Sequence, residues 1–281
     1  MKIISQIDEF RQYRRVLNRN KIGFVPTMGY LHDGHLSLID KSLEENQATI
    51  VSIFVNPTQF GPGEDLDRYP RDFPQDRQIL EARSVDCIFF PDSDQIYGAN
   101  YATFIEVKKL ETVLCGKTRP THFRGVTTVV LKLFNLVKPT TAYFGQKDAQ
   151  QAAIIQKMVK DLNMNVKLKV LPTLREKDGL AMSSRNKYLS PKQRKDASVL
   201  YQALNEAKNM IEAGEKNTDK IKERMKKAIN KIDSKIDYIS IVDADSLKDV
   251  SVISGKALIA LAVRIGRARL IDNIQIIADK K

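Results

Sequence analysis

Residues 22–45, IGFVPTMGYLHDGHLSLIDKSLEE, decide the fold because a strand, a turn and a helix follow one another directly in this stretch. Ile22–Val25 is a short apolar run of the kind that forms a buried strand. Apolar residues return with helical spacing over Leu36–Glu45, and the segment between the two runs carries Pro and Gly, which mark a turn. The stretch therefore predicts one unit of a parallel sheet with crossover helices.

The same alternation continues along the chain to about residue 172. Further strands are expected at Thr49–Val55, Asp86–Phe90, Ala142–Phe144 and Val166–Leu171, and further helices at Phe73–Arg83, Val126–Val137 and Ala149–Leu162. We therefore predict an α/β fold in which residues 1–173 form a doubly wound, Rossmann-like parallel sheet domain. Ligands of such sheets bind beyond the carboxyl ends of the strands, so chemistry is expected in the loops that follow Val25, Val55, Phe144 and Leu171.

The pattern changes after Pro172. Two lysine-rich helices are expected near Pro191–Ala213 and Thr218–Ile232, followed by strands at Tyr238–Val242, Ala257–Val263 and Arg269–Ile277. We expect residues 174–281 to form a smaller C-terminal α+β domain.

Length and composition limit the class of protein. A chain of 281 residues can bury a full core without disulfides or metals. Cys87 and Cys115 lack CxxC spacing, so we expect reduced thiols and neither a zinc nor a redox site. The N-terminus does not resemble a signal peptide and no apolar run reaches membrane length, so we expect a cytoplasmic protein with no membrane partner.

The net charge of +12 raises the question of anionic partners. Much of the excess lies between Lys187 and Lys235, where basic and acidic side chains are interleaved and aromatic residues are sparse. That pattern favours a solvated surface over a nucleic-acid interface, and we expect no nucleic-acid partner.

Two of the three histidines, His32 and His35, lie in the turn between the first strand and its helix. A strand-to-helix turn offers unpaired backbone N–H groups and the positive end of the helix dipole to a phosphate, and Gly29 and Gly34 allow close approach. Imidazoles at this place can donate to ATP as charge builds on the leaving pyrophosphate. The alternative is a pair of structural or metal-binding histidines.

The second and third loops carry amides and charges. Asn56 and Gln59 suit the hydroxyls and carboxylate of a small polar substrate, although a plain turn would also explain the local Pro and Gly. Lys147 can neutralise a phosphate, and Asp148 can hold Mg²⁺ or, alternatively, cap the following helix. Gln151 lies about one helical turn further along.

The fourth loop, REKDGLAMSSRN over residues 175–186, follows the last strand of the predicted sheet. Ser183 and Ser184 can donate to a phosphate that Arg185 binds as a fork, so this polar loop is a candidate phosphate clamp; alone it would read as a flexible linker. His122, at the head of a predicted helix, could equally be a local capping residue.

The HxGH motif and the later Met-Ser-Ser-Arg segment resemble the HIGH and KMSKS pair of nucleotidyltransferases and class I aminoacyl-tRNA synthetases, which form acyl adenylates. The strings PTMGYLHDGH, FVNPTQF, RPTHFRGVTTVVLKLFN, FGQKDAQQ and SSRNKYL, in this order between residues 26 and 189, resemble the pantothenate synthetase family, and LAVRIGRARLIDN near the C-terminus is also similar. One departure is Thr121, where many members have Gly.

The resemblance implies ATP-dependent ligation of (R)-pantoate and β-alanine through a pantoyl adenylate, with release of pyrophosphate and AMP. It also implies Mg²⁺, a homodimer, and His35, His32, Lys147 and Arg185 as catalytic residues. Gln59 would bind pantoate and β-alanine, Gln151 would bind pantoate, and Asn56 lies in the substrate motif. The implied ATP-binding residues are Met28, Gly29, Tyr30, Leu31, His32, Asp33, Gly34, His35, Gly145, Gln146, Lys147, Asp148, Leu174, Met182, Ser183, Ser184 and Arg185, and residues 175–185 would act as a lid that excludes water.

Two other readings make different predictions. Another adenylate-forming enzyme of the same superfamily, such as a shortened aminoacyl-tRNA synthetase, would need an anticodon-binding module, and the residues after Pro172 are too few and too poor in aromatics for one. A non-catalytic RNA-binding protein would bind RNA in a strongly salt-dependent way and would leave the four polar loops unexplained.

Overall fold

The computed structural model describes residues 1–17 and 19–278, which form two compact units. Unit 1 consists of Met1–Glu111, Arg119–Gly145 and Gln151–Pro172, leaving out residue 18. Unit 2 consists of Thr112–Thr118, Gln146–Gln150 and the described residues from Thr173 onward. The predicted division between residues 173 and 174 did not include the two short segments that unit 2 takes from earlier in the chain.

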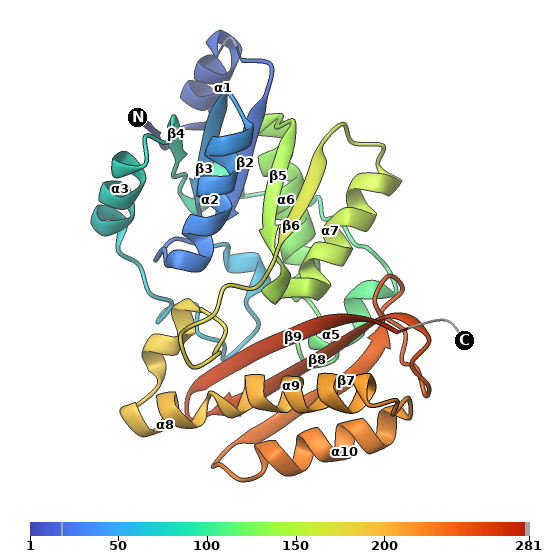
Figure 1. Ribbon diagram of the computed structural model, residues 1–281. Coiled ribbons are helices and arrows are strands. Elements are labelled where there is room, and N and C mark those ends of the chain that lie inside the picture. Colours follow the sequence, from blue (N-terminus) through green and yellow to red (C-terminus); the bar gives the residue numbers. More distant parts are fainter. Residues whose placement is uncertain (18, 279–281) are drawn as a thin grey trace. The chain divides into compact units, whose positions relative to one another are not determined.

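Unit 1 is built on a six-stranded parallel sheet with the strand order β1-β4-β3-β2-β5-β6 (Figure 1). The strands are β1 (Lys2–Ile4), β2 (Ile22–Thr27), β3 (Ala48–Ile53), β4 (Cys87–Phe89), β5 (Thr141–Gly145) and β6 (Lys167–Leu171). β2 and β5 are hydrogen-bonded neighbours although β3 and β4 lie between them in the chain. The order of strands therefore switches between β2 and β5, and ligands of such sheets bind at the carboxyl ends beside this switch.

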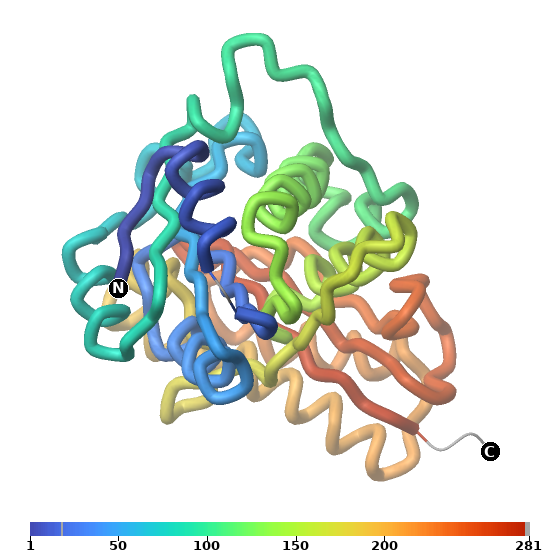
Figure 2. The backbone as a smooth tube through the Cα atoms, turned by 90° about the horizontal axis from the view of Figure 1, so that it is seen from above, coloured from blue at the N-terminus to red at the C-terminus, as the bar shows by residue number. Residues whose placement is uncertain are grey.

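Helices cover both faces of the sheet because the central strands are apolar on both sides. In β2, Val25 belongs to the same buried cluster as Ile39 of α2 (Asp33–Glu45), whereas the ring of Phe24 lies 6.2 Å from that of Phe134 in α6 (His122–Val137). Figures 1 and 2 show α2 on one face and α6 on the other. The remaining helices of this part of the chain are α1 (Ile7–Val16), α3 (Phe73–Ala82), α4 (Ser93–Ile96), α7 (Ala149–Asp161) and the short η1 (Pro57–Gln59) and η2 (Leu110–Thr112). The predicted doubly wound sheet is confirmed.

Unit 2 contains a three-stranded antiparallel meander, β7-β8-β9, packed against two helices. Its elements are α5 (Cys115–Thr118), η3 (Gln146–Asp148), η4 (Ser184–Tyr188), α8 (Pro191–Asp196), α9 (Val199–Glu212), α10 (Thr218–Ile229), β7 (Lys235–Asp243), β8 (Gly255–Ile265) and β9 (Ala268–Ala278). Leu200 and Leu204 of α9, Ile221 of α10, and Ile259 and Leu261 of β8 share one buried core. The predicted smaller α+β part is confirmed.

Three expectations about elements need correction. The single helix expected over Pro191–Ala213 is interrupted between α8 and α9, where the Ser198 hydroxyl donates to the Lys195 carbonyl at 2.9 Å and so competes with the helical pattern. β1 was missed because it is a three-residue edge strand that pairs only with β4. α1 was missed because Phe10 is its one buried residue.

The described residues also bear on the compartment-related expectations. Cys87 and Cys115 are both free and buried. No helix in the described part of the chain is long and apolar enough to cross a membrane.

Candidate functional site

The histidine motif forms the start of α2. His32 is the N-cap: its Nδ1 accepts from the Gly34 backbone N–H at 3.2 Å, and Nδ1 of His35 accepts from the His32 backbone N–H at 3.3 Å, which makes a reciprocal capping box. The two rings lie with centroids 4.0 Å apart. Because both Nδ1 atoms accept, the neutral imidazoles carry their proton on Nε2. The fold thus fixes both rings as Nε2–H donors at the positive end of a helix.

The turn before His32 is held by Asp76 of α3, which the sequence did not single out. Asp76 is 2% exposed, and its two carboxylate oxygens accept from the backbone N–H groups of Tyr30 at 2.8 Å and Leu31 at 2.7 Å. Burial raises the pKa of Asp76, and these two hydrogen bonds oppose the shift. Gly29 has φ +78°, and a Cβ there would lie 2.9 Å from the Asp76 carboxylate, so this position requires glycine.

The expectation of unpaired backbone N–H groups in this turn is therefore wrong for six residues, among which Gly29 donates to the Thr27 hydroxyl and His35 donates to the His32 carbonyl. The N–H groups of Tyr30 and Leu31 donate to Asp76, and those of His32 and Gly34 donate to the imidazoles. A phosphate at this turn would therefore meet the two imidazoles and the helix dipole.

The amides of the second loop contact each other and the first loop. Asn56 is 1% exposed; its Nδ2 donates to Gln59 Oε1 and to the Gly125 carbonyl, each at 3.1 Å, and its Oδ1 accepts from the Tyr97 hydroxyl at 2.8 Å. Gln59 Nε2 donates to the Met28 sulfur at 3.1 Å. A thioether is a weak acceptor, so an oxygen of a ligand would be a better partner for this amide. Asn56, by contrast, is engaged as a support for Gln59.

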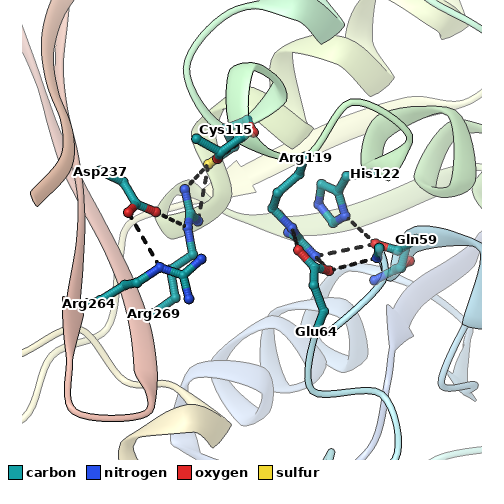
Figure 3. A network of polar contacts seen from close by, with 10 residues as sticks. Gln59, Glu64, Cys115, Arg119, His122, Asp237, Arg264 and Arg269 are labelled. Carbon is teal, nitrogen blue, oxygen red and sulfur yellow. Dashed lines mark hydrogen bonds and ion pairs between the residues drawn. The ribbon is translucent and has the colours of Figure 1, made fainter. Parts of the chain in front are cut away.

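The main chain of Gln59 is held by residues that precede and begin α6 (Figure 3). His122 Nδ1 donates to the Gln59 carbonyl at 2.8 Å, and Arg119 Nη2 donates to it at 3.3 Å. Arg119 also forms a two-pronged ion pair with Glu64, at 2.5 and 2.6 Å. The alternative that His122 caps α6 is therefore wrong: Thr121 is the N-cap, and the His122 ring bonds to the Gln59 carbonyl instead. Thr121, the departure from the family pattern, has φ −99°, a conformation that any residue adopts.

Burial opposes ionisation of Glu64, but the hydrogen bonds and charge of Arg119, the Gly61 N–H and the nearby His122 outweigh it, so the pKa of Glu64 is lowered. Glu64 and Arg119 were missed as functional residues, although Arg119 opens one of the strings quoted from the sequence. Their pairing is a long-range contact across 55 positions, which no local pattern reveals.

The third cluster follows β5 and belongs to unit 2 from Gln146 onward. Asn273 of β9 fixes its backbone: Nδ2 donates to the carbonyls of Gln146 and Lys147, each at 2.9 Å, while Oδ1 accepts from the Gln146 side chain at 3.0 Å. Lys147 Nζ lies 3.3 Å from an Asp148 carboxylate oxygen, and the Asp148 side chain is 43% exposed. Asn273 lies in the C-terminal similar string, but its role required the structure.

The fourth loop is a tight hairpin within unit 2. The Met182 N–H donates to the Leu174 carbonyl at 3.0 Å, so the hairpin brings these two ATP-binding candidates together. Ser183 caps η4 by accepting from the Arg185 N–H at 3.3 Å, and Ser184 is buried. The base of the hairpin is fixed by an ion pair of 2.6 Å between Arg175 and the buried Asp272.

The candidates divide between the two units. Unit 1 contains the candidates from Met28 to His35 together with Asn56, Gln59, Gly145 and Gln151, and unit 2 contains Gln146, Lys147, Asp148, Leu174 and Met182–Arg185. Within unit 1 the structure brings Met28, Asn56 and Gln59 into contact. In the described residues, no group of three or more His, Cys, Asp or Glu side chains is arranged to hold a metal ion.

Comparison with known proteins places this arrangement in one family. Residues 2–275 match the family described as Pantoate-beta-alanine ligase. The chain is 54% identical over 276 residues to the pantothenate synthetase of Thermotoga petrophila, covering 97% of this chain and 99% of the relative, and 55% identical over 277 residues to that of Caldicellulosiruptor bescii, covering 98% of each.

Solved structures agree. A pantothenate synthetase from Thermus thermophilus is similar with a TM-score of 0.93 at 43% identity, covering 98% of this chain and 99% of that one. A pantoate-beta-alanine ligase from Francisella tularensis, complexed with beta-gamma ATP and beta-alanine, is similar with a TM-score of 0.81 at 39% identity, covering 98% and 97%. The chain belongs to the pantoate–β-alanine ligase family.

Proposed function

We propose that this protein joins (R)-pantoate and β-alanine to pantothenate at the expense of ATP. In the first step a carboxylate oxygen of pantoate attacks the α-phosphorus of ATP, and pyrophosphate leaves as the bond to the β-phosphate oxygen breaks. In the second step the β-alanine amine attacks the acyl carbon, loses a proton, and displaces AMP. The observation that carries the proposal is the family match over residues 2–275, together with two imidazoles fixed as donors at the switch of a doubly wound sheet.

The proposed roles follow from charge and hydrogen-bonding capacity. Charge on the leaving pyrophosphate meets the cations Lys147 and Arg185 and the Nε2–H groups of His35 and His32, which donate hydrogen bonds to it. The remaining ATP-binding candidates are also assigned to the nucleotide, on the resemblance to the family. Neutral amides bind the organic acids, because an amide can donate to a carboxylate and accept from a hydroxyl.

Two glutamine side chains bind the organic substrates. Gln59 binds pantoate and β-alanine, and Gln151 binds pantoate. Asn56 acts by holding Gln59, to which its side chain donates at 3.1 Å.

We also propose that ATP acts as its Mg²⁺ complex. Mg²⁺ typically keeps several waters and takes one or two carboxylates together with substrate phosphates. The half-exposed Asp148 fits such a single protein ligand, and when bound the ion would neutralise phosphate charge. A homodimer, a cytoplasmic location and a water-excluding role for residues 175–185 are further proposals that rest on the resemblance to the family.

The experiment that tests the function follows the two half-reactions separately. Pyrophosphate release from ATP and Mg²⁺ should require pantoate, and AMP and pantothenate should appear in quantity only after β-alanine is added. Turnover with a different carboxylic acid and none with pantoate would keep an adenylating enzyme and refute the substrate. Salt-sensitive RNA binding without any turnover would refute the enzyme.

A further inference from the structure

We propose that Glu64, Arg119 and His122 are positioning residues that aim the Gln59 amide and thereby set the enzyme's affinity for its organic substrates. The proposal rests on the proposed function, in which Gln59 binds pantoate and β-alanine. None of the three needs to touch a substrate, since each acts on the main chain that carries Gln59.

The Gln59 carbonyl oxygen accepts hydrogen bonds from two donors at once. His122 Nδ1 lies 2.8 Å and Arg119 Nη2 lies 3.3 Å from the same oxygen. Gly125, one helical turn after His122, approaches the Thr58 and Gln59 backbone so closely that an added Cβ would lie 2.4 Å from the Thr58 carbonyl oxygen. The second loop therefore packs closely against the start of α6 and is hydrogen-bonded to His122 there.

Arg119 also forms an ion pair with Glu64, which lies five positions after Gln59 at the other end of the same loop. The Arg119 side chain is 13% exposed and that of Glu64 is 23% exposed, and both carboxylate oxygens contact the guanidinium. Glu64 also accepts from the Gly61 N–H at 3.1 Å. Arg119 thus contacts both the first and the last of the six residues from Gln59 to Glu64, which leaves little freedom for the main chain between them.

The side chain of Gln59 has weaker anchors of its own. It has one hydrogen bond to Asn56 and one to the sulfur of Met28, and the latter is a weak acceptor. If the hydrogen bonds to the Gln59 carbonyl are lost, the side-chain amide of Gln59 is no longer held in one orientation. The affinity for pantoate and β-alanine then falls, whereas the affinity for ATP does not. A hydrogen bond of this kind is worth about 3- to 10-fold in an equilibrium.

The test uses two substitutions of His122 that differ in where they place a donor. In His122→Asn the side-chain NH₂ lies near the position of Nδ1, so the bond to the Gln59 carbonyl is kept; in His122→Gln the NH₂ lies near the position of Nε2, and the bond is lost. We expect KM for pantoate and β-alanine to stay within about 3-fold of the parent in His122→Asn and to rise about tenfold in His122→Gln, with KM for ATP unchanged in both.

Arginine offers a matched pair. Arg119→Lys should raise KM for pantoate, because a lysine cannot hold Glu64 and the Gln59 carbonyl together. Arg269→Lys is the control: Arg269 is also 13% exposed and forms an ion pair with Asp237 at 2.7 Å, but this pair belongs to unit 2 (Figure 3). Arg269→Lys should leave KM for pantoate unchanged.

Equal losses in His122→Asn and His122→Gln, or a rise in KM for ATP that matches the rise for pantoate, would overturn the proposal. A crystal structure of each variant gives a readout that needs no turnover. The contact of 3.1 Å between Gln59 Nε2 and Met28 Sδ should persist in His122→Asn and be lost in His122→Gln. If the parent protein does not use pantoate, the proposed function is wrong. The contact between Gln59 Nε2 and Met28 Sδ in the variant structures then decides by itself whether His122 positions Gln59.

Discussion

Replacement of Gly125 by alanine is a sharp test of the packing around Gln59. In a helix such a change ordinarily stabilises by about 0.5–1 kcal/mol, because glycine loses more backbone freedom on folding. Here the added Cβ would lie 2.4 Å from the Thr58 carbonyl oxygen and 2.6 Å from the Gln59 nitrogen, where ordinary contact begins at 3.4 Å. Since the atoms it meets are backbone, the second loop must move by about 1 Å.

The size of the effect follows from that displacement. Overpacking of this kind costs about 1–3 kcal/mol, which exceeds or cancels the gain in helix propensity. A shift of about 1 Å in a group that orients a substrate can lower a rate about 100-fold. We therefore expect Gly125→Ala to unfold at equal or lower urea concentration than the parent and to form the adenylate about 100 times more slowly.

The assay is pyrophosphate release at saturating ATP and pantoate, with urea unfolding followed by circular dichroism because the chain has no tryptophan. Gly98→Ala is the control: nothing lies within 4 Å of a Cβ at Gly98, so both measurements should match the parent. A Gly125→Ala protein that is more stable than the parent and forms adenylate within about 3-fold of its rate would refute the reasoning.

Two further predictions concern the carboxylates of Asp76 and Glu64. Asp76→Asn keeps one acceptor oxygen where the parent has two, so the N–H of Tyr30 or Leu31 is left without a hydrogen bond. The free energy of unfolding should fall by about 1–3 kcal/mol, and KM for ATP should rise. A variant as stable as the parent in urea would contradict this prediction. Arg119 lowers the pKa of Glu64 below its ordinary 4.5, so the ion pair stabilises the fold above that pH and the contribution is lost as the pH falls through the lowered value. The parent's advantage in stability over Glu64→Gln should therefore shrink between about pH 6 and pH 3, and an advantage independent of pH would show that the carboxylate charge is not responsible.

The fold was largely predictable because its determinants are local and periodic. Strands such as β2 and β3 are largely apolar runs, and α2 ends at Glu45 as predicted, although it begins at Asp33 and not at the predicted Leu36. The four loops at strand ends could be predicted from the same pattern, since parallel strands bring their carboxyl ends to one edge. The failures were β1, an edge strand of three residues, α1, which buries one residue, and the break between α8 and α9.

The site was predictable in its residues but not in its contacts. The motifs named His32, His35 and Gln59, yet nothing local shows that Asp76, 46 positions after Tyr30, would occupy the backbone donors assumed to face a phosphate. In the same way, the opposite hydrogen-bonding states of the histidines depend on tertiary partners. The Nδ1 atoms of His32 and His35 accept, whereas Nδ1 of His122 donates.

The central claim is that the carboxylate of pantoate becomes bonded to AMP before the amine attacks, and isotope transfer tests it most directly. Pantoate labelled with ¹⁸O in its carboxylate is turned over with ATP and β-alanine, and the AMP is analysed by mass spectrometry. If an acyl adenylate forms, the attacking oxygen stays on phosphorus when the acyl–oxygen bond breaks, so each AMP should carry one ¹⁸O from fully labelled pantoate. Unlabelled AMP, with pantothenate still formed, would contradict the adenylate route.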